Sequence, residues 1–338
     1  MEENENFIPE SAPLTEDAPK LIMPNQEYAS FPLSRNYWSQ FGLLFGLIGG
    51  GLIVGSIISI VIIKLMIPHA HLFDLEKAIM LPENTTAMKV VQLVSTFVMF
   101  FVPAYIFSSI VYKKPFEHLG FNLKITWQQL GLVILIAWAA LLVGAALGDL
   151  NEKIPIPAHW RAKFQKAEDE YQQQVVAIAT MHNIKEYLVG LFVIALMPAF
   201  VEETFFRGTL QQLFIRWFRN PWVGIIVTSI LFSAIHFSYF GFLTRAMLGV
   251  VLGLLFYYGK SIWLNILAHF LNNAVAVTAL YMGALNGKQP KDALEDHFPI
   301  WLSLAGTAFL VYLLINYKKI SEAFLAKNET LFTSDNTL

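Results

Sequence analysis

The chain has 338 residues, of which 56% are hydrophobic and only 14% are charged. Soluble domains usually carry about a quarter charged residues, so this composition argues against an ordinary cytosolic enzyme. The net charge of −2 argues against an electrostatic hold on nucleic acid. The absence of cysteine excludes disulfides, thiolate zinc sites and cysteine nucleophiles. The composition therefore predicts a polytopic membrane protein.

Residues 1–36 are acidic, contain prolines and are weakly apolar, which predicts a disordered tail without a cleavable signal peptide. A bilayer span requires roughly 20 mainly apolar residues. Stretches of this kind predict an all-α membrane bundle of about eight transmembrane helices around a polar cavity. We expect one transmembrane domain, residues 37–320, and a polar C-terminal tail, residues 321–338. The apolar stretches lie near 40–66, 89–112, 127–148, 186–218, 221–240, 242–258, 261–282 and 298–317.

The only long connection, residues 149–185, separates the third stretch from the fourth. Its mixed charge and its helix-forming residues are compatible with an interfacial helix on the bilayer surface and equally with a solvated connecting helix. An even number of spans places both termini on one side of the membrane. Because the basic pairs Lys113–Lys114 and Lys318–Lys319 lie directly at span ends, we expect that side to be the cytoplasm.

Ionisable residues within the apolar stretches are concentrated in three of them. Each such residue costs about 2.5–3.5 kcal/mol at the centre of a membrane helix, so it persists mainly where it is paired or functional. Three predicted helices therefore bring polar groups to one slab of the membrane, which indicates a site. These groups are Glu202, Glu203 and Arg207 in the fourth stretch, His236 in the fifth, and His269, Asn272 and Asn273 in the seventh.

Helical geometry separates the two glutamates of the fourth stretch. On a helix, Arg207 lies about 40° from Glu203 but about 140° from Glu202. Glu203 and Arg207 are therefore expected to form an ion pair four residues apart, which neutralises both charges. Glu202 faces away from that pair and is free to act as a general base in a bundle cavity. The alternative is that all three residues form a buried polar lock between helices.

His236 follows Phe232 by four residues and Ser233 by three, so a helix would place the three side chains on one face. Taken alone, a histidine inside a membrane is as often a packing residue as a catalytic one. A serine nucleophile at Ser233 is weakly supported, because no separate aspartate is present to orient a triad. The other candidate groups in the same slab favour a functional role for His236.

His269 and Asn273 lie four residues apart, and Asn272 lies to the side of them. A histidine and an asparagine that project together can donate hydrogen bonds to a developing oxyanion. For Asn272, hydrogen bonding between helices is the preferred interpretation.

Zinc is the one cofactor that these residues suggest. Glu202, His236 and His269 are a plausible ligand set with an open water position. However, the sequence lacks the H-E-x-x-H helix of zinc proteases, and water activation without a metal is equally compatible with the same residues. The other histidines fall in predicted loops, and we expect most of them to be solvated; they are His69, His71, His118, His159, His182 and His297.

Three ordered motifs between about residues 186 and 282 resemble those of the CPBP family, the CAAX proteases and bacteriocin-processing enzymes that are also called the Abi family. The motifs are E-E-x-x-x-R at Glu202, Glu203 and Arg207, F-x-x-x-H at Phe232 and His236, and H-x-x-x-N at His269 and Asn273. The resemblance implies an intramembrane endopeptidase with a helical bundle around a water-filled cavity. It also implies that Glu203 and Arg207 support the catalytic site.

By the same resemblance, Glu202 and His236 would activate the attacking water, and His269 and Asn273 would stabilise the oxyanion. The implied substrate is a peptide or protein associated with the membrane. Eukaryotic members cleave the last three residues from prenylated CAAX proteins, and some bacterial members are linked to bacteriocin maturation or self-immunity. The lack of a visible signal peptide and the compact connections favour a bacterial inner membrane.

Two other functions are compatible with the same residues. A proton-coupled transporter could use the intramembrane ionisable groups as a relay. However, transporters commonly contain repeated halves, and the first half of this chain has no counterpart of the E-E-x-x-x-R segment. A non-enzymatic self-immunity or scaffold protein could retain the family shape, although an intact set of catalytic residues favours the protease.

Overall fold

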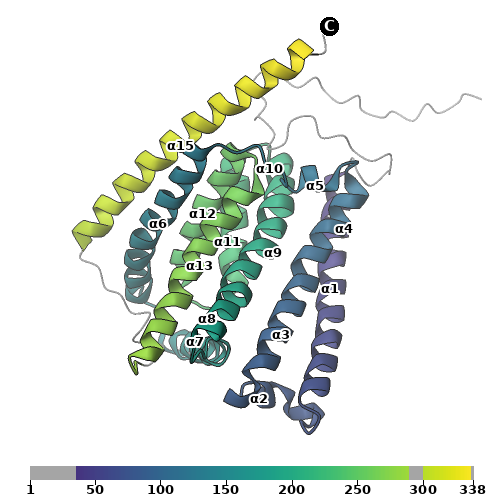
Figure 1. Cartoon of the computed structure of the whole chain (residues 1–338), viewed down its shortest axis with the longest axis vertical. Helices are drawn as coiled ribbons and strands as arrows, with labels where there is room; N and C mark the ends of the chain where they lie inside the picture. The colour runs from purple at the N-terminus through teal and green to yellow at the C-terminus, as the bar shows by residue number, and fades with distance from the viewer. Residues whose placement is uncertain (1–35, 289–299, 336–338) are drawn as a thin grey trace, which may run out of the picture.

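The computed structural model describes residues 36–288 and 300–335, and these residues form helices and connections without a strand (Figure 1). The tail predicted at residues 1–35 lies outside the described residues. Within them, six helical segments are long and apolar enough to cross a membrane, which confirms a helical membrane bundle. The six segments are Tyr37–Met66, Pro82–Val111, Trp127–Lys153, Ile184–Phe218, Phe242–Gly259 and Ile262–Leu285.

The predicted count of eight spans is not confirmed. In the place of the fifth span, α11 (Pro221–Ala234) is apolar but shorter than a span. In the place of the eighth, α15 (Ile300–Asp335) is not among the six. This helix also continues through most of the segment 321–338, where a polar tail was predicted.

The N-terminal part is an antiparallel pair of long helical segments (Figure 1). The first helix, α1 (Tyr37–Met66), begins where the Asn36 side chain accepts a hydrogen bond from the backbone N–H of Trp38 at 2.9 Å, as an N-cap should. The returning segment comprises η3 (Pro82–Asn84), α3 (Thr85–Thr96), a π-helical stretch η4 (Phe97–Phe101) and α4 (Val102–Val111). The connections carry η2 (Leu72–Asp74), α2 (Leu75–Ile79) and, after α4, α5 (Pro115–His118).

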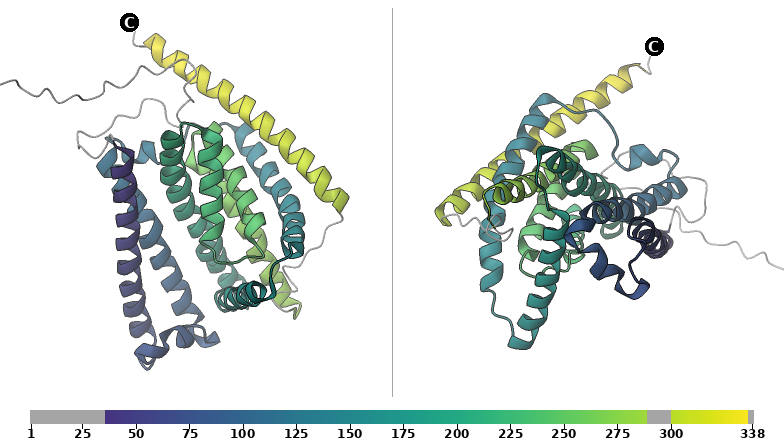
Figure 2. Two further views of the ribbon diagram at one scale, coloured as in Figure 1. Left: turned by 180° about the vertical axis from the view of Figure 1, so that it is seen from behind. Right: turned by 60° about the horizontal axis from the view of Figure 1, so that its bottom comes forward.

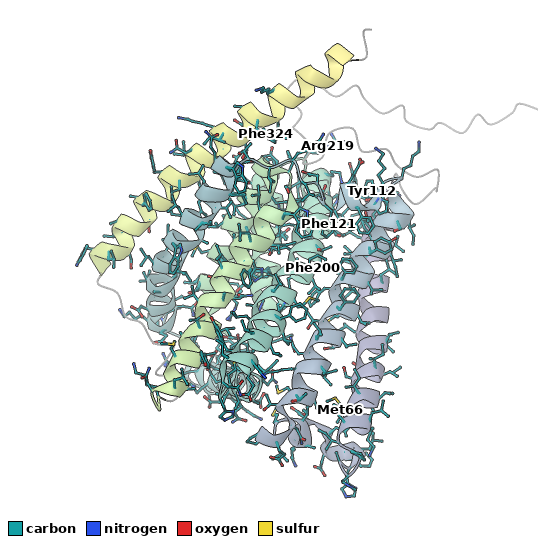
Figure 3. The ribbon with its side chains drawn as sticks, in the orientation of Figure 1. Met66, Tyr112, Phe121, Phe200, Arg219 and Phe324 are labelled. Atoms are coloured by element: carbon teal, nitrogen blue, oxygen red, sulfur yellow. The ribbon has the colours of Figure 1, made fainter. Side chains whose placement is uncertain are left out.

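An aromatic layer joins this pair to the rest of the bundle. The ring of Phe200 lies 5.4 Å from that of Phe101 and 5.7 Å from that of Phe121, measured between ring centroids (Figure 3). At one end of the bundle, His118 is buried and stacks on Tyr112, with the ring centroids 3.7 Å apart. His118 is therefore an exception to the expectation that most of these histidines are solvated. Burial, and secondarily the charge of Arg216, hold the pKa of His118 well below its usual range.

The C-terminal part packs around α6 (Trp127–Lys153), which begins with a capping box between Thr126 and Gln129. The neighbours of α6 are α12 (Phe242–Gly259), α13 (Ile262–Leu285) and α15. Figure 2 shows α15 running obliquely along the outside of this group. Apolar side chains fill the space between these four helices; they include Val133, Leu252, Leu264 and Leu313.

The central segment, residues 184–218, is one continuous helix of 35 residues with two widened stretches. It comprises α8 (Ile184–Gly190), the π-helical η5 (Leu191–Leu196), α9 (Met197–Phe205), the π-helical η6 (Phe206–Gln211) and α10 (Gln212–Phe218). Pro198, which lacks an N–H donor, is the second residue of α9, just after η5. Short π-helical stretches often occur at functional sites, and these two flank the helix turns that carry Glu202 and Glu203.

The fifth predicted span, 221–240, is too long at its C-terminal end, because α11 stops at Ala234 and residues 235–241 form a loop. Contacts from elsewhere in the chain hold this loop. The Asn151 side chain of α6 donates to the carbonyl of Tyr239 at 2.9 Å and accepts from the N–H of Leu243 at 3.0 Å. These partners replace the hydrogen bonds that a continued helix would make.

The predicted connection at 149–185 contains a helix, α7 (Ala158–Ile178), which runs crosswise at one end of the bundle (Figures 1 and 2). It packs against the loop 235–241. The ring of Phe164 stacks on that of Tyr239 at 4.5 Å between centroids, and Ser238 donates a hydrogen bond to the Glu168 carboxylate at 2.6 Å. The helix therefore covers one end of the polar loop.

Candidate active site

A buried ion pair forms the centre of the polar cluster. The Oε1 atom of Glu203 lies 2.6 Å from Nη1 of Arg207, and both side chains have an exposed fraction of 0%. The structure thus contains the ion pair predicted from the helical spacing. Arg207 also donates from Nη2 to the carbonyl oxygen of Gly249 on α12, at 3.2 Å. The pair therefore connects the central helix to α12.

The Glu203 carboxylate also holds two residues of α13. Nδ1 of His269 lies 2.8 Å from Oε1 of Glu203. Because a carboxylate only accepts, this nitrogen of His269 carries the proton. Asn265, which is fully buried, donates from Nδ2 to Oε2 of Glu203 at 3.3 Å and to the carbonyl of Leu252 at 2.6 Å. Glu203 is therefore a fixed acceptor that orients the His269 ring.

Glu202 points to the other side of the same ring. Its Oε2 atom lies 4.0 Å from Nε2 of His269, which is too far for a direct hydrogen bond. The Glu202 side chain is 12% exposed, in contrast to the fully enclosed Glu203. Glu202 is also close enough to His236 and to Tyr171 of α7 for its charge to act on both side chains. This glutamate is the more accessible of the two carboxylates.

His236 lies in the loop after α11 and not within a helix as predicted. Its Nδ1 atom is 2.8 Å from the carbonyl oxygen of Phe232. The carbonyl is an acceptor, so Nδ1–H donates and Nε2 is left as the basic nitrogen. Glu202, Arg245 and His269 are near enough for their charges to act on this imidazole. His236 therefore presents a basic nitrogen beside the Glu202 carboxylate.

Phe232 connects the parts of the cluster. Its ring meets that of His236 edge-on at 5.2 Å and that of His269 at 5.7 Å, measured between ring centroids. The Arg207 guanidinium lies over the same ring, with its carbon 4.6 Å from the centroid. The phenylalanine of the F-x-x-x-H motif is thus the apolar surface on which both histidines and the arginine pack.

The remaining candidates of the sequence analysis have looser or different surroundings. Asn272 and Asn273 are half-buried on α13, and among the described residues neither side chain shows a hydrogen bond. Ser233 is fully buried and donates to the carbonyl of Phe242 at 2.7 Å. Ser233 therefore holds the loop 235–241 and is not positioned as a nucleophile.

Three residues near the cluster were not found by sequence reasoning. Asn265 precedes His269 by four residues, so the helical spacing already places the two on one face. Tyr171 and Arg245 gave no signal, because each is carried by another helix, α7 or α12, and only the fold brings it to the site. Burial raises the pKa of Tyr171, and the negative charges of Glu168 and Glu202 add to this effect against that of Arg245.

The residues suggested as zinc ligands do not form a ready-made metal site. Within residues 36–288 and 300–335, no three histidine or acidic side chains converge closely enough to hold a metal ion. Nδ1 of His236 and Nδ1 of His269 are both hydrogen-bonded, which leaves Nε2 of each ring as the nitrogen that a metal ion or a water molecule could use.

The bundle and its enclosed cluster of glutamates, histidines and arginine define a polytopic membrane protein with a polar site at membrane depth. Residues 184–275, a little over a quarter of the chain, match the family model described as Rce1-like, type II CAAX prenyl endopeptidase Rce1-like. This segment contains all three motifs and confirms the resemblance to the CPBP family. Residues 184–275 are therefore similar to a membrane protease of the CAAX endopeptidase type. No curated protein and no solved structure matches the chain.

Proposed function

We propose that the protein is an intramembrane endopeptidase in which Glu202 and His236 activate a water molecule for attack on a peptide bond. The observation that carries the proposal is the division of labour between the adjacent glutamates. The Glu203 carboxylate binds Arg207 and Nδ1 of His269, whereas Glu202 is partly exposed and its carboxylate lies 4.0 Å from Nε2 of His269. One carboxylate is structural and the other is available for chemistry.

The proposed reaction begins when the Glu202 carboxylate takes a proton from water, assisted by the basic Nε2 of His236. The hydroxide adds to the carbonyl carbon of the peptide bond and produces a tetrahedral oxyanion. In its doubly protonated form His269 donates Nδ1–H to Glu203, and its Nε2–H is then available to the oxyanion. Glu202 returns the proton to the amine nitrogen as the carbon–nitrogen bond breaks.

Asn273 completes the proposed oxyanion site. It lies one helix turn beyond His269 on α13, and its half-buried side chain keeps its donors available for a substrate oxygen. The pair Glu203 and Arg207 supports the site because it fixes the orientation of the His269 ring. The substrate is a membrane-associated peptide or protein, and the family description points to cleavage near a prenylated C-terminus.

The test is a peptidase assay on the full-length protein in nanodiscs, with fluorescence-quenched CAAX peptides with and without a farnesyl group. Glu202→Gln, His236→Gln and His269→Gln should each lower kcat by about 100-fold or more, as removal of a general base or oxyanion donor does. His71→Gln is the matched control, since His71 is exposed in a distant connection. Cleavage by Glu202→Gln at the wild-type rate would overturn the mechanism.

Two further arms of the assay separate the alternatives. If a chelator abolishes cleavage and zinc restores it, a metal ion activates the water, and the metal-free mechanism is wrong. If no peptide is cleaved but the protein conducts protons into liposomes in a Glu202-dependent manner, the transporter replaces the protease.

We infer that both termini face the cytoplasm of a bacterial cell membrane. Tyr112 and Arg219 lie at one end of the bundle with Phe324, and Met66 lies at the other (Figure 3). The basic pairs Lys113–Lys114 and Lys318–Lys319 precede or follow these markers closely, which supports a cytoplasmic location for their end. Because the chain has no cysteine, a single cysteine at Lys124 or at Asn286 can be labelled from one side of the membrane. Labelling of Lys124→Cys from outside intact cells would reverse the orientation.

A further inference from the structure

The helix α7 lies across one end of the bundle and brings an aromatic ring, that of Tyr171, to the catalytic cluster (Figure 2). The guanidinium carbon of Arg245 lies 5.8 Å from the centroid of this ring. Tyr171 is also near enough to Glu202 for the charge of the carboxylate to act on it. The Glu202 side chain is only 12% exposed. Tyr171 is therefore part of the cover over the carboxylate that water and substrate must reach.

Two further contacts join α7 to the loop that carries the catalytic histidine. The ring of Phe164 stacks on that of Tyr239, with the centroids 4.5 Å and the planes 2° apart. The Glu168 carboxylate accepts a hydrogen bond from Ser238 at 2.6 Å. Phe164, Glu168 and Tyr171 follow one another at spacings of four and three residues, so they lie on one face of α7. An extended peptide needs about 4.8 Å between its backbone and the next, so none can pass between α7 and the loop while these contacts are made.

The two ends of α7 are held differently. Directly after the helix, Ala179 and Met181 are buried in an apolar cluster with side chains of α13. Before the helix, residues 154–157 include two prolines and are not helical. Within α7 itself only the last residue, Ile178, is buried. Segments with few buried apolar contacts open at a low free energy, and the lids of active sites belong to this class. The helix is thus anchored at its C-terminal end and held elsewhere mainly by its contacts with the loop.

We propose that α7 is a lid over the active site, which opens at its contacts with the loop 235–241 to admit the substrate and closes with the Tyr171 ring beside Glu202 for hydrolysis. This proposal rests on the proposed endopeptidase function, because it concerns access to that site. Closure limits the water around the general base and strengthens the electrostatic interactions within the site. Because the C-terminal end of α7 is anchored, the contacts of Phe164 and Glu168 open while that end stays in place. The lid itself takes no part in bond cleavage.

The first test holds the lid closed by a covalent bridge. The chain has no cysteine, so only an engineered pair can be cross-linked. Glu168→Cys and Ser238→Cys are combined in the full-length protein in nanodiscs and bridged with a short bis-methanethiosulfonate reagent. The bridge should lower the cleavage rate of a fluorescence-quenched farnesylated CAAX peptide by at least about 10-fold, and a reductant should restore it.

The matched control for the bridge is Gln165→Cys combined with Asp169→Cys. Both residues lie on α7, with Nε2 of Gln165 at 2.9 Å from Oδ1 of Asp169, so this bridge leaves the contacts with the loop free. The control should cleave equally well before and after reduction. If the bridged Glu168→Cys/Ser238→Cys protein cleaves as fast as its reduced form, α7 does not open and the proposal is wrong.

The second test measures opening without any cleavage, through the reaction of Glu202→Cys with a water-soluble methanethiosulfonate reagent. Adding Phe164→Ala or Tyr171→Ala should raise the labelling rate about 10-fold, because each removes part of the cover. Tyr171→Phe retains the ring and should leave the rate unchanged. Gln173→Ala should also leave it unchanged, since Gln173 is exposed on the outer face of α7. A labelling rate that neither alanine substitution alters would show that α7 is a fixed part of the bundle.

The two tests together distinguish this proposal from the proposed function. Cleavage that the bridge does not slow overturns the lid and leaves the protease intact. Labelling that depends on Phe164 and Tyr171, in a protein that cleaves no peptide whether bridged or reduced, retains the lid and overturns the protease.

Discussion

Substituting the two adjacent glutamates separately should divide stability from catalysis. Glu203→Gln removes the charge that faces Arg207 in a pair with no exposed surface. Removing one partner of a buried ion pair costs about 3–5 kcal/mol, because the other charge stays buried without compensation. At about 2–4 °C per kcal/mol, the midpoint of thermal unfolding should fall by about 6–20 °C. Glu203→Gln should also lose activity, since His269 loses its orienting acceptor.

Glu202→Gln should behave in the opposite way. The Glu202 side chain is partly exposed, and Nε2 of His269 is 4.0 Å from its carboxylate, outside hydrogen-bond distance. A pair of this kind contributes at most about 1 kcal/mol, so the unfolding midpoint should move by less than about 4 °C. Turnover should nevertheless fall by about 100-fold or more, because the general base is absent.

The assay measures thermal unfolding by circular dichroism in detergent, alongside peptide cleavage in nanodiscs. The double variant Glu203→Gln/Arg207→Met serves as the internal control. It removes both charges, and it should therefore be less destabilised than the sum of the two single variants by at least about 1 kcal/mol. Two results would refute the distinct roles of the two glutamates. In the first, Glu202→Gln unfolds at as low a temperature as Glu203→Gln. In the second, the destabilisation of the double variant equals the sum of those of Glu203→Gln and Arg207→Met.

Three further outcomes follow from particular contacts. Asn265→Leu removes the hydrogen-bond donors to Glu203 and to the carbonyl of Leu252, so we expect the free energy of unfolding to fall by about 1.5–3 kcal/mol. The kcat should also fall, with little change in KM. A variant as stable as the wild type would contradict these contacts. Gly208→Ala should lower the free energy of unfolding by about 1–3 kcal/mol, because the added methyl group would lie 2.9 Å from the backbone oxygen of Leu119. Gly131→Ala is the control, because its methyl group meets open space, and it should stabilise α6 by up to about 1 kcal/mol. Burial depresses the pKa of His118, so below about pH 6.5 the unfolded chain binds more protons than the folded protein does. The free energy of unfolding should therefore fall with decreasing pH by up to about 1.4 kcal/mol per pH unit. His118→Phe should make this dependence on pH weaker, and an unchanged slope would contradict the role of His118.

Contacts within the cluster could be predicted from the sequence where both residues of the contact lie on the same helix. The ion pair of Glu203 with Arg207 follows from a spacing of four residues, and it survives although Arg207 lies in a π-helical stretch. The same spacing rule, applied to α13, would have found Asn265 beside His269. This residue was overlooked because a single asparagine in an apolar run carries no charge to draw attention.

The end of α11 could not be predicted in the same way. Residues 221–240 are apolar enough for one continuous helix, and nothing in their own pattern breaks it after Ala234. The break depends on Asn151, which is more than eighty residues earlier in the chain and binds Tyr239 in the loop and Leu243 at the start of α12. Tertiary contacts of this kind override local helix propensity. The periodicity of the sequence therefore could not predict that Tyr171 and Arg245 lie near the candidate active site.

The early end of α11 also explains how water chemistry is compatible with the membrane. A helix of 14 residues is about 21 Å long, which is shorter than the roughly 30 Å hydrocarbon core, so the loop that carries His236 lies at membrane depth. Non-helical backbone is tolerated there only when it is enclosed by protein or lines a wet cavity. Carbonyl groups of this loop accept hydrogen bonds from the side chains of Asn151 and Arg245, and α7 covers one side of it. Ser233 donates to the carbonyl of Phe242, directly after the loop. The same contacts place the polar backbone of this loop beside His236 and the partly exposed Glu202, and the proposed hydrolysis requires such polar surroundings.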